Sequence, residues 1–137
     1  MSNPDKVILI VEDSDDDLFL MDVALKEVPC ENPIQIARDG QEAVDYLNGA
    51  GQFADRRKFP FPALVFLDLK LPYLSGLEIL GWMREQSNLP RTFVAVLTGS
   101  NQPADVKKAN ELGADTYLVK PATSQMLSDI FRQCHLR

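Results

Sequence analysis

The groups that often mark a zinc site or a redox centre are scarce in this sequence. It contains one histidine, His135, and two cysteines, Cys30 and Cys134, which stand far apart and form no CxxC pair. This spacing argues against a zinc site or a dithiol pair and favours reduced thiols in a cytoplasmic protein. The lone histidine, close to the C-terminus, is interpreted as a surface residue.

Clustered positive charge and long apolar runs are scarce as well. The net charge is −6, with 14 Lys and Arg against 20 Asp and Glu, and the one basic run, residues 56–58, is short. Without a basic footprint, neither nucleic acid nor an anionic membrane is expected as the main partner. No apolar run is long enough to span a bilayer, and the polar residues 1–6 do not resemble a signal region. We therefore expect a cytoplasmic protein.

Five short apolar runs alternate with stretches of helical period. The predicted strands cover residues 7–11, 34–37, 63–67, 93–97 and 116–119. The first is apolar at every position, which is typical of a strand buried on both faces of a parallel sheet. A length of 137 residues suits one domain. We therefore expect an α/β fold with a five-stranded parallel sheet, doubly wound as (βα)5, in the flavodoxin-like order 2-1-3-4-5.

Two connections carry further signals. Residues 49–62 form a longer link than usual and contain Phe53, Phe59 and Phe61. These rings either cover the core beneath a long loop or form a partner patch, and the first interpretation is favoured. Ser75 stands before Gly76 at the start of the third predicted helix, where its hydroxyl is expected to cap the helix.

Polar residues follow four of the five predicted strands. Glu12 and Asp13 follow the first strand, Asp68 the third, Thr98 the fourth and Lys120 the fifth. Because the carboxyl ends of parallel strands share one edge of a sheet, these side chains are expected to converge in one pocket. Carboxylates that lie close together raise one another's pKa, and a bound divalent cation would relieve this conflict. Oxygen donors favour Mg²⁺ over zinc.

These residue types suit phosphoryl transfer to a carboxylate. Asp68 is the candidate nucleophile because it ends the central strand and is already ionised at pH 7. Mg²⁺ held by Asp13 and Asp68 would neutralise part of the phosphoryl charge. Lys120 would supply a second positive charge, and the Thr98 hydroxyl would donate to a remaining oxygen. Each residue alone also fits a helix start, a turn or a solvated lysine, so the prediction depends on their joint placement.

At this level of detail the chain resembles the receiver domain of two-component response regulators, over nearly its whole length. The matching motifs are the acidic pair Glu12-Asp13, the segment Asp68-Leu69-Lys70-Leu71-Pro72 with Ser75-Gly76 after it, Thr98-Gly99, and Tyr117 with Lys120-Pro121. The resemblance implies a phosphoprotein of signal transduction that is not an enzyme for a separate substrate. Such a domain catalyses only its own phosphorylation and dephosphorylation.

The resemblance also implies a donor and a metal site. A sensor histidine kinase or a phosphotransfer protein would pass a phosphoryl group from its phosphohistidine to Asp68. Mg²⁺ would be bound by Asp13, Asp68 and the backbone carbonyl of Lys70, with Glu12 acting through water.

A switch and an output surface are implied in the same way. Thr98 and Tyr117 would respond to the phosphoryl group that Lys120 binds, and the bond from Lys120 to Pro121 would be cis. Since no output domain is visible, residues 1–137 are expected to form a single, stand-alone receiver domain. It would dock to a downstream protein or a second copy through the predicted helix at residues 101–112, the fifth strand and the last helix. Residues 49–62 and 68–72 resemble the subgroup paired with bacterial phytochrome kinases.

Two other classes of protein use a doubly wound sheet. Phosphatases with an aspartate nucleophile carry a second Asp two residues after it, where this chain has Lys70, and no substrate-capping domain is visible. A flavin- or nucleotide-binding module would need a Gly- or Ser/Thr-rich phosphate loop after the first strand. The acidic residues 12–15 would repel a phosphate there, so both alternatives are less favoured than a receiver domain.

Overall fold

The computed structural model describes residues 6–29 and 31–134. Cys30 and His135, which entered the sequence interpretation, lie outside the described residues. Among the helices that are described, none combines the length and apolarity needed to cross a membrane.

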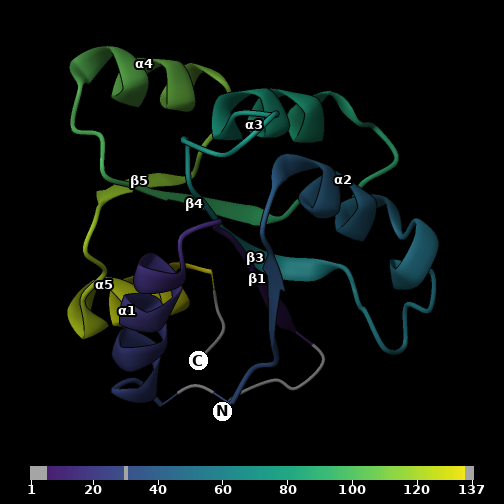
Figure 1. The fold of residues 1–137 in the computed structure, drawn as a ribbon, viewed down its shortest axis with the longest axis horizontal. Coiled ribbons are helices and arrows are strands. Elements are labelled where there is room, and N and C mark those ends of the chain that lie inside the picture. Colours follow the sequence, from purple (N-terminus) through teal and green to yellow (C-terminus); the bar gives the residue numbers. More distant parts are fainter. Residues whose placement is uncertain (1–5, 30, 135–137) are drawn as a thin grey trace.

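Five parallel strands form one sheet in the order β2-β1-β3-β4-β5, which confirms the predicted fold class and strand order. The strands are β1 (Val7–Val11), β2 (Ile34–Ala37), β3 (Pro62–Leu67), β4 (Phe93–Thr98) and β5 (Thr116–Val119). The helices are α1 (Asp15–Lys26), α2 (Gly40–Asn48), the short 3-10 helix η1 (Gly51–Phe53), α3 (Gly76–Glu85), α4 (Pro103–Glu111) and α5 (Ser124–Gln133). Helices α1 and α5 cover one face of the sheet, and α2, α3 and α4 cover the other (Figure 1).

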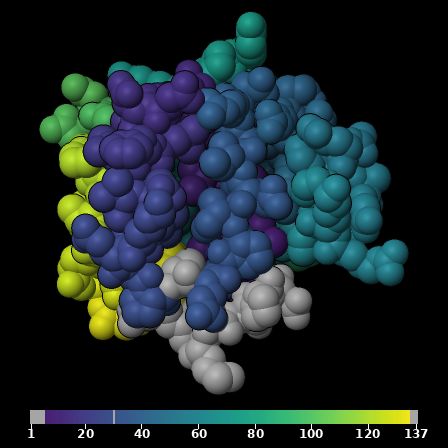
Figure 2. All heavy atoms as spheres, turned by 60° about the horizontal axis from the view of Figure 1, so that its bottom comes forward, coloured from purple at the N-terminus to yellow at the C-terminus, as the bar shows by residue number. Residues whose placement is uncertain are grey.

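The alternation of side chains in β1 explains why one apolar run supports two cores. All five residues are buried. Val7, Leu9 and Val11 pack in a cluster with side chains of α2 and α3, whereas Ile8 and Ile10 pack in a cluster with α1 and α5. Successive strand residues point to opposite faces, so an uninterrupted apolar strand needs helices on both sides. Figure 2 shows the outer surface of α1, with α5 along its edge.

The start of α3 is held tightly against the end of β3. The Ser75 hydroxyl accepts the Glu78 N–H, and the Glu78 carboxylate accepts the Ser75 N–H, which confirms the predicted cap as a capping box. A Cβ atom at Gly76 would lie 2.1 Å from the carbonyl oxygen of Asp68, so this position requires glycine. The close approach fixes the loop that follows Asp68.

Residues 49–62 pack against the core. Phe53 is buried, and the centroid of its ring lies 5.0 Å from that of Tyr46 and 5.2 Å from that of Phe59. The Arg56 guanidinium lies over the Tyr46 ring and donates to the carbonyls of Phe59 and Leu47. These contacts support the interpretation that the aromatic residues of this segment cover the core.

Candidate functional site

The strand register brings four predicted site residues to one edge of the sheet. The last residues of β1 and β3 pair with each other, so Glu12 and Asp68 stand side by side just beyond them. The last residues of β4 and β5 also pair, and the Lys120 N–H donates to the Thr98 carbonyl at 2.8 Å. The peptide bond between Lys120 and Pro121 is cis, the conformation that the resemblance implies.

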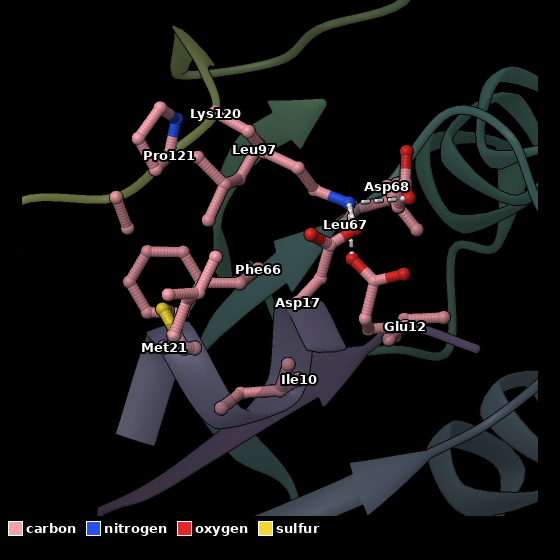
Figure 3. A pocket seen from close by; sticks show the side chains of 13 residues that line it. Ile10, Glu12, Asp17, Met21, Phe66, Leu67, Asp68, Leu97, Lys120 and Pro121 are labelled. Carbon is pink, nitrogen blue, oxygen red and sulfur yellow. Dashed lines mark hydrogen bonds and ion pairs between the residues drawn. The ribbon is translucent and has the colours of Figure 1, made fainter. Parts of the chain in front are cut away.

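The ammonium group of Lys120 lies among three carboxylates. Its Nζ atom is 2.5 Å from Glu12 Oε1, 2.7 Å from Asp17 Oδ2 and 2.8 Å from Asp68 Oδ2. Figure 3 shows the three acidic side chains pointing toward it. One oxygen from each carboxylate lies within 4.8 Å of the others. With all three acids ionised, one ammonium leaves the cluster with excess negative charge.

This crowding shifts the proton equilibria of the site. Burial raises the pKa of Glu12 above its ordinary value, and the Asp68 charge adds to this effect, although the hydrogen bond from Lys120 opposes it. Burial alone would lower the pKa of Lys120, but its hydrogen bonds to Asp17, Asp68 and Glu12 outweigh burial and raise it. Lys120 is therefore firmly protonated, and the carboxylates are only partly compensated.

Thr98 offers a donor that the described protein groups do not use. The residue is fully buried, and its Oγ1 atom finds no hydrogen-bond partner within the described residues. Leaving a buried hydroxyl unsatisfied costs about 1–3 kcal/mol, which an oxygen atom of a ligand would recover. The unpaired hydroxyl, the ammonium and the Asp68 carboxylate form a set that fits a phosphoryl group.

Two residues of the expected metal site, Asp13 and Lys70, have exposed side chains. Asp13 is exposed, and its carboxylate is not among the three that surround Lys120. Its N–H donates to Glu12 Oε2 at 3.1 Å, so the two acids remain adjacent. The Lys70 side chain is exposed, and its N–H donates to Asp68 Oδ1 at 3.1 Å. The oxygens that gather at this edge belong to carboxylates, which fit a hard divalent cation.

The sequence alone does not single out Asp17, which is one of three consecutive aspartates at the start of α1. The Ser14 hydroxyl caps α1 by accepting the Asp17 N–H at 3.3 Å. Asp17 precedes the buried residues Met21 and Ala24 by four and seven positions, so all three share the inner face of the helix. This periodicity was the signal that could have found it.

A chain of hydrogen bonds links the neighbouring loop to α4. The Tyr117 hydroxyl donates to the Ser100 carbonyl at 2.8 Å, and the Ser100 hydroxyl donates to Asp105 Oδ2 at 2.5 Å. The Tyr117 ring is partly buried against a cluster that includes Val96 and Ala109. Tyr117 therefore contacts both the loop that follows β4 and helix α4.

The fold and the arrangement of this site define a receiver domain. Residues 8–132 match the family model described as response regulator receiver domain. The chain belongs to this family, a class of signalling proteins that generally act in two-component systems. The resemblance inferred from the motifs is confirmed.

Relatives from phytochrome signalling are among the similar proteins. The chain is 39% identical over 131 residues to response regulator Rcp1 from Synechocystis sp., covering 96% of this chain and 85% of that protein. The Mn²⁺-bound structure of Rcp1 has a TM-score of 0.76 and 36% identity, covering 94% of this chain and 88% of that one. The bacteriophytochrome response regulator AtBRR gives a TM-score of 0.83 and 36% identity, with 96% and 94% covered. The phosphorylated cyanobacterial phytochrome response regulator RcpA gives 0.78 and 32%, with 93% and 89% covered.

Proposed function

We propose that this protein accepts a phosphoryl group on Asp68 from the phosphohistidine of a sensor histidine kinase or a phosphotransfer protein. The observation that carries the proposal is the buried Thr98 hydroxyl, which lacks a partner among the described residues at the edge where Lys120 meets Asp68. A buried donor without an acceptor suggests a ligand oxygen that arrives later. The similarity to RcpA, whose structure is of the phosphorylated form, supports the same reading.

In the proposed transfer an Asp68 carboxylate oxygen attacks phosphorus. A new O–P bond forms while the N–P bond of the donor breaks, and the imidazole leaves with the electron pair of that bond. Lys120, held in its protonated form, donates to a phosphoryl oxygen and compensates its charge. Thr98 donates to another phosphoryl oxygen, which satisfies its hydroxyl. No general base is needed because the nucleophile is already ionised.

Mg²⁺ is the proposed cofactor, held by Asp13, Asp68 and the Lys70 carbonyl, with Glu12 acting through water. When bound, it would offset negative charge on the phosphoryl oxygens. The excess of carboxylates over ammonium groups at this edge supports a divalent cation. The Mn²⁺-bound form of Rcp1 supports it by similarity. For the metal to bind, Lys120 must share Glu12 and Asp68 with it.

A mass measurement tests the phosphoacceptor. Incubation with acetyl phosphate and Mg²⁺ should add one phosphoryl group to the wild-type protein and none to Asp68→Asn. Asp55→Asn removes an exposed carboxylate that precedes β3 and should leave the wild-type yield unchanged. A full phosphoryl yield in Asp68→Asn would show that another residue is the acceptor.

The proposed output surface is formed by α4, β5 and α5. β5 is the edge strand and lies between the two helices (Figure 1). Val119 exposes 37% of its surface there, and Tyr117 connects the strand to the loop that precedes α4. We expect the phosphorylated form to dock to a downstream protein or a second copy through this surface.

Beryllofluoride, a mimic of the phosphoryl group, tests the output surface. It should shift amide signals of residues 100–120 and change sedimentation or partner binding. The control is Asp68→Asn, which should not respond. Shifts confined to the loops around Asp68 and Lys120 would argue against a switch in this surface.

A further inference from the structure

Asp17 makes a contact that the proposed chemistry does not yet use. Its Oδ2 atom accepts a hydrogen bond from Lys120 Nζ at 2.7 Å, across 103 positions of sequence. An ammonium group has three N–H donors. Glu12, Asp17 and Asp68 each take one of them, so the donors of Lys120 are saturated in the structure.

These three contacts cannot all persist during phosphoryl transfer, because Lys120 has no free N–H left to donate to a phosphoryl oxygen. In the proposed function Asp68 becomes the site of the new O–P bond, and Glu12 serves the metal through water. Asp17 has neither task, so its bond to Lys120 is the one that can remain throughout. One N–H would then stay on Asp17 while the other two point toward Asp68 and the phosphoryl oxygens.

The surroundings of Lys120 show why such an anchor matters. A cavity of ≈ 320 Å³ adjoins the ammonium between α1 and the loop after β5. Its wall beyond the charged groups is apolar and includes Ile10, Met21, Phe66 and Leu97 (Figure 3). The four-carbon stem of lysine is flexible, and this cavity gives it room without offering a polar partner. Asp17 lines this cavity from α1, next to the ammonium.

Asp17 is well placed to act as this anchor. Its backbone is fixed at the capped start of α1, and its side chain is about two-thirds buried, at 33% exposure. The contact ties α1 to the loop after β5, so the position of the ammonium is set by two elements.

We propose that Asp17 is a positioning residue for phosphoryl transfer. Its carboxylate holds one N–H of Lys120 so that the remaining donors face the Asp68 acceptor. The inference rests on the proposed function of Asp68. It requires a hydrogen-bond acceptor at position 17 and does not require the negative charge itself.

The test compares Asp17→Ala, Asp17→Asn and the control Asp16→Ala, which removes an exposed acid one position earlier on the same helix. Phosphorylation rates are measured against both acetyl phosphate and Mg²⁺ concentration, which separates the maximal rate from half-saturation. Asp17→Ala should lower the maximal rate roughly tenfold, because a misplaced group costs rate without weakening donor binding. Asp17→Asn, whose amide oxygen can still accept, should recover most of it. Asp16→Ala should match the wild type.

An ammonium spectrum provides a readout that a purely structural role would not change. In ¹H–¹⁵N spectra of the metal-free protein, the Lys120 ammonium signal should be protected from exchange in the wild type and Asp17→Asn, and lost in Asp17→Ala. A wild-type maximal rate in Asp17→Ala overturns the inference. The inference is also overturned if Asp17→Asn loses as much of the maximal rate as Asp17→Ala does. It is overturned as well if Asp17→Ala changes only the Mg²⁺ concentration needed for half-saturation, which would rise. If the wild-type protein takes no phosphoryl group on Asp68, the proposed function fails along with the inference.

Discussion

Strands β4 and β5 carry a charged cluster at each end, and the two clusters differ in how completely their groups are paired. Before the strands lie Arg84, Arg91 and Asp115; beyond them lies the site around Lys120. In the first cluster two guanidinium groups share one carboxylate. In the second, one ammonium serves three carboxylates, and the Thr98 hydroxyl nearby has no partner among the described residues.

In the cluster before the strands, the charged groups of Arg84, Arg91 and Asp115 all have hydrogen-bond partners. Arg84 donates to the carbonyls of Gly113 and Thr92 as well as to Asp115. Burial would raise the pKa of Asp115, but hydrogen bonds from Arg91 and the Val94 N–H hold it below its ordinary value. The pKa of Glu12 is shifted the other way, upward. The difference indicates that the first cluster stabilises the fold, whereas the second retains excess negative charge, as we would expect at the proposed site for a cation and a phosphoryl group.

Breaking the paired cluster should have the largest effect on stability. Arg84→Ala removes four hydrogen bonds from a side chain that is only 19% exposed, and it leaves the Gly113 and Thr92 carbonyls without these donors. We expect the free energy of unfolding to fall by about 3 kcal/mol, measured by urea denaturation. The control is Arg91→Ala, whose side chain is 64% exposed and should cost no more than about 1 kcal/mol. Equal losses in both variants would contradict the distinction.

Neutralising one acid in each of the two charged clusters should change the free energy of unfolding in opposite directions. Asp115→Asn removes a carboxylate whose pKa is lowered by folding, so its ionised form stabilises the native state at pH 7. The loss should be about 1–2 kcal/mol. Glu12→Gln removes a carboxylate whose pKa is raised by folding, so its ionised form destabilises the native state at pH 7. This destabilisation is relieved as the pH falls through the folded pKa, because the carboxyl group becomes protonated.

Without metal, Glu12→Gln should therefore raise the free energy of unfolding by on the order of 1 kcal/mol. Denaturation at pH 7 in the presence of a chelator measures both variants. A decrease in both would mean that the carboxylates around Lys120 stabilise the fold as ordinary ion pairs. Added Mg²⁺ should reduce the gain in Glu12→Gln, because the cation relieves the same repulsion in the wild type.

The same contrast explains what could be predicted from the sequence. Strands β1, β3 and β4 are dense apolar runs, and their alternation with helices predicts a parallel sheet, for which right-handed crossovers allow few strand orders. The edge shared by Glu12, Asp68, Thr98 and Lys120 follows from that parallel topology. The Asp17 contact depends on the rotation of α1 about its axis, which an acidic helix start does not reveal. The Arg84–Asp115 pair joins α3 to the loop before β5, and no spacing rule links such distant positions. Side-chain pairing between elements is tertiary information.

Helix α4 connects the two clusters, and its two ends should differ in mobility. At its C-terminal end the Gly113 carbonyl accepts two hydrogen bonds from Arg84, at 3.1 and 2.9 Å. At its N-terminal end the Gln102 side chain provides no cap, and the Ser100 hydroxyl is the group that holds the first turn, donating to Asp105 Oδ2 and accepting the Gln102 N–H at 3.3 Å. The end that lies toward Thr98 is therefore held more weakly, which suits an element that responds to a phosphoryl group.

Removing the hydrogen bond between Ser100 and Asp105 should have the most local effect of the changes considered. Asp105→Ala should speed amide hydrogen exchange in residues 101–106 about fivefold, the equivalent of one hydrogen bond of about 1 kcal/mol. Exchange in residues 107–113 should stay nearly unchanged, because Arg84 still holds the other end, and the free energy of global unfolding should fall by no more than about 1 kcal/mol. The matched control is Glu111→Ala, which removes an exposed acid from the C-terminal end of the same helix. If Asp105→Ala instead speeds exchange evenly along α4, the helix opens as one unit, and the unequal anchoring of its ends does not govern its motion.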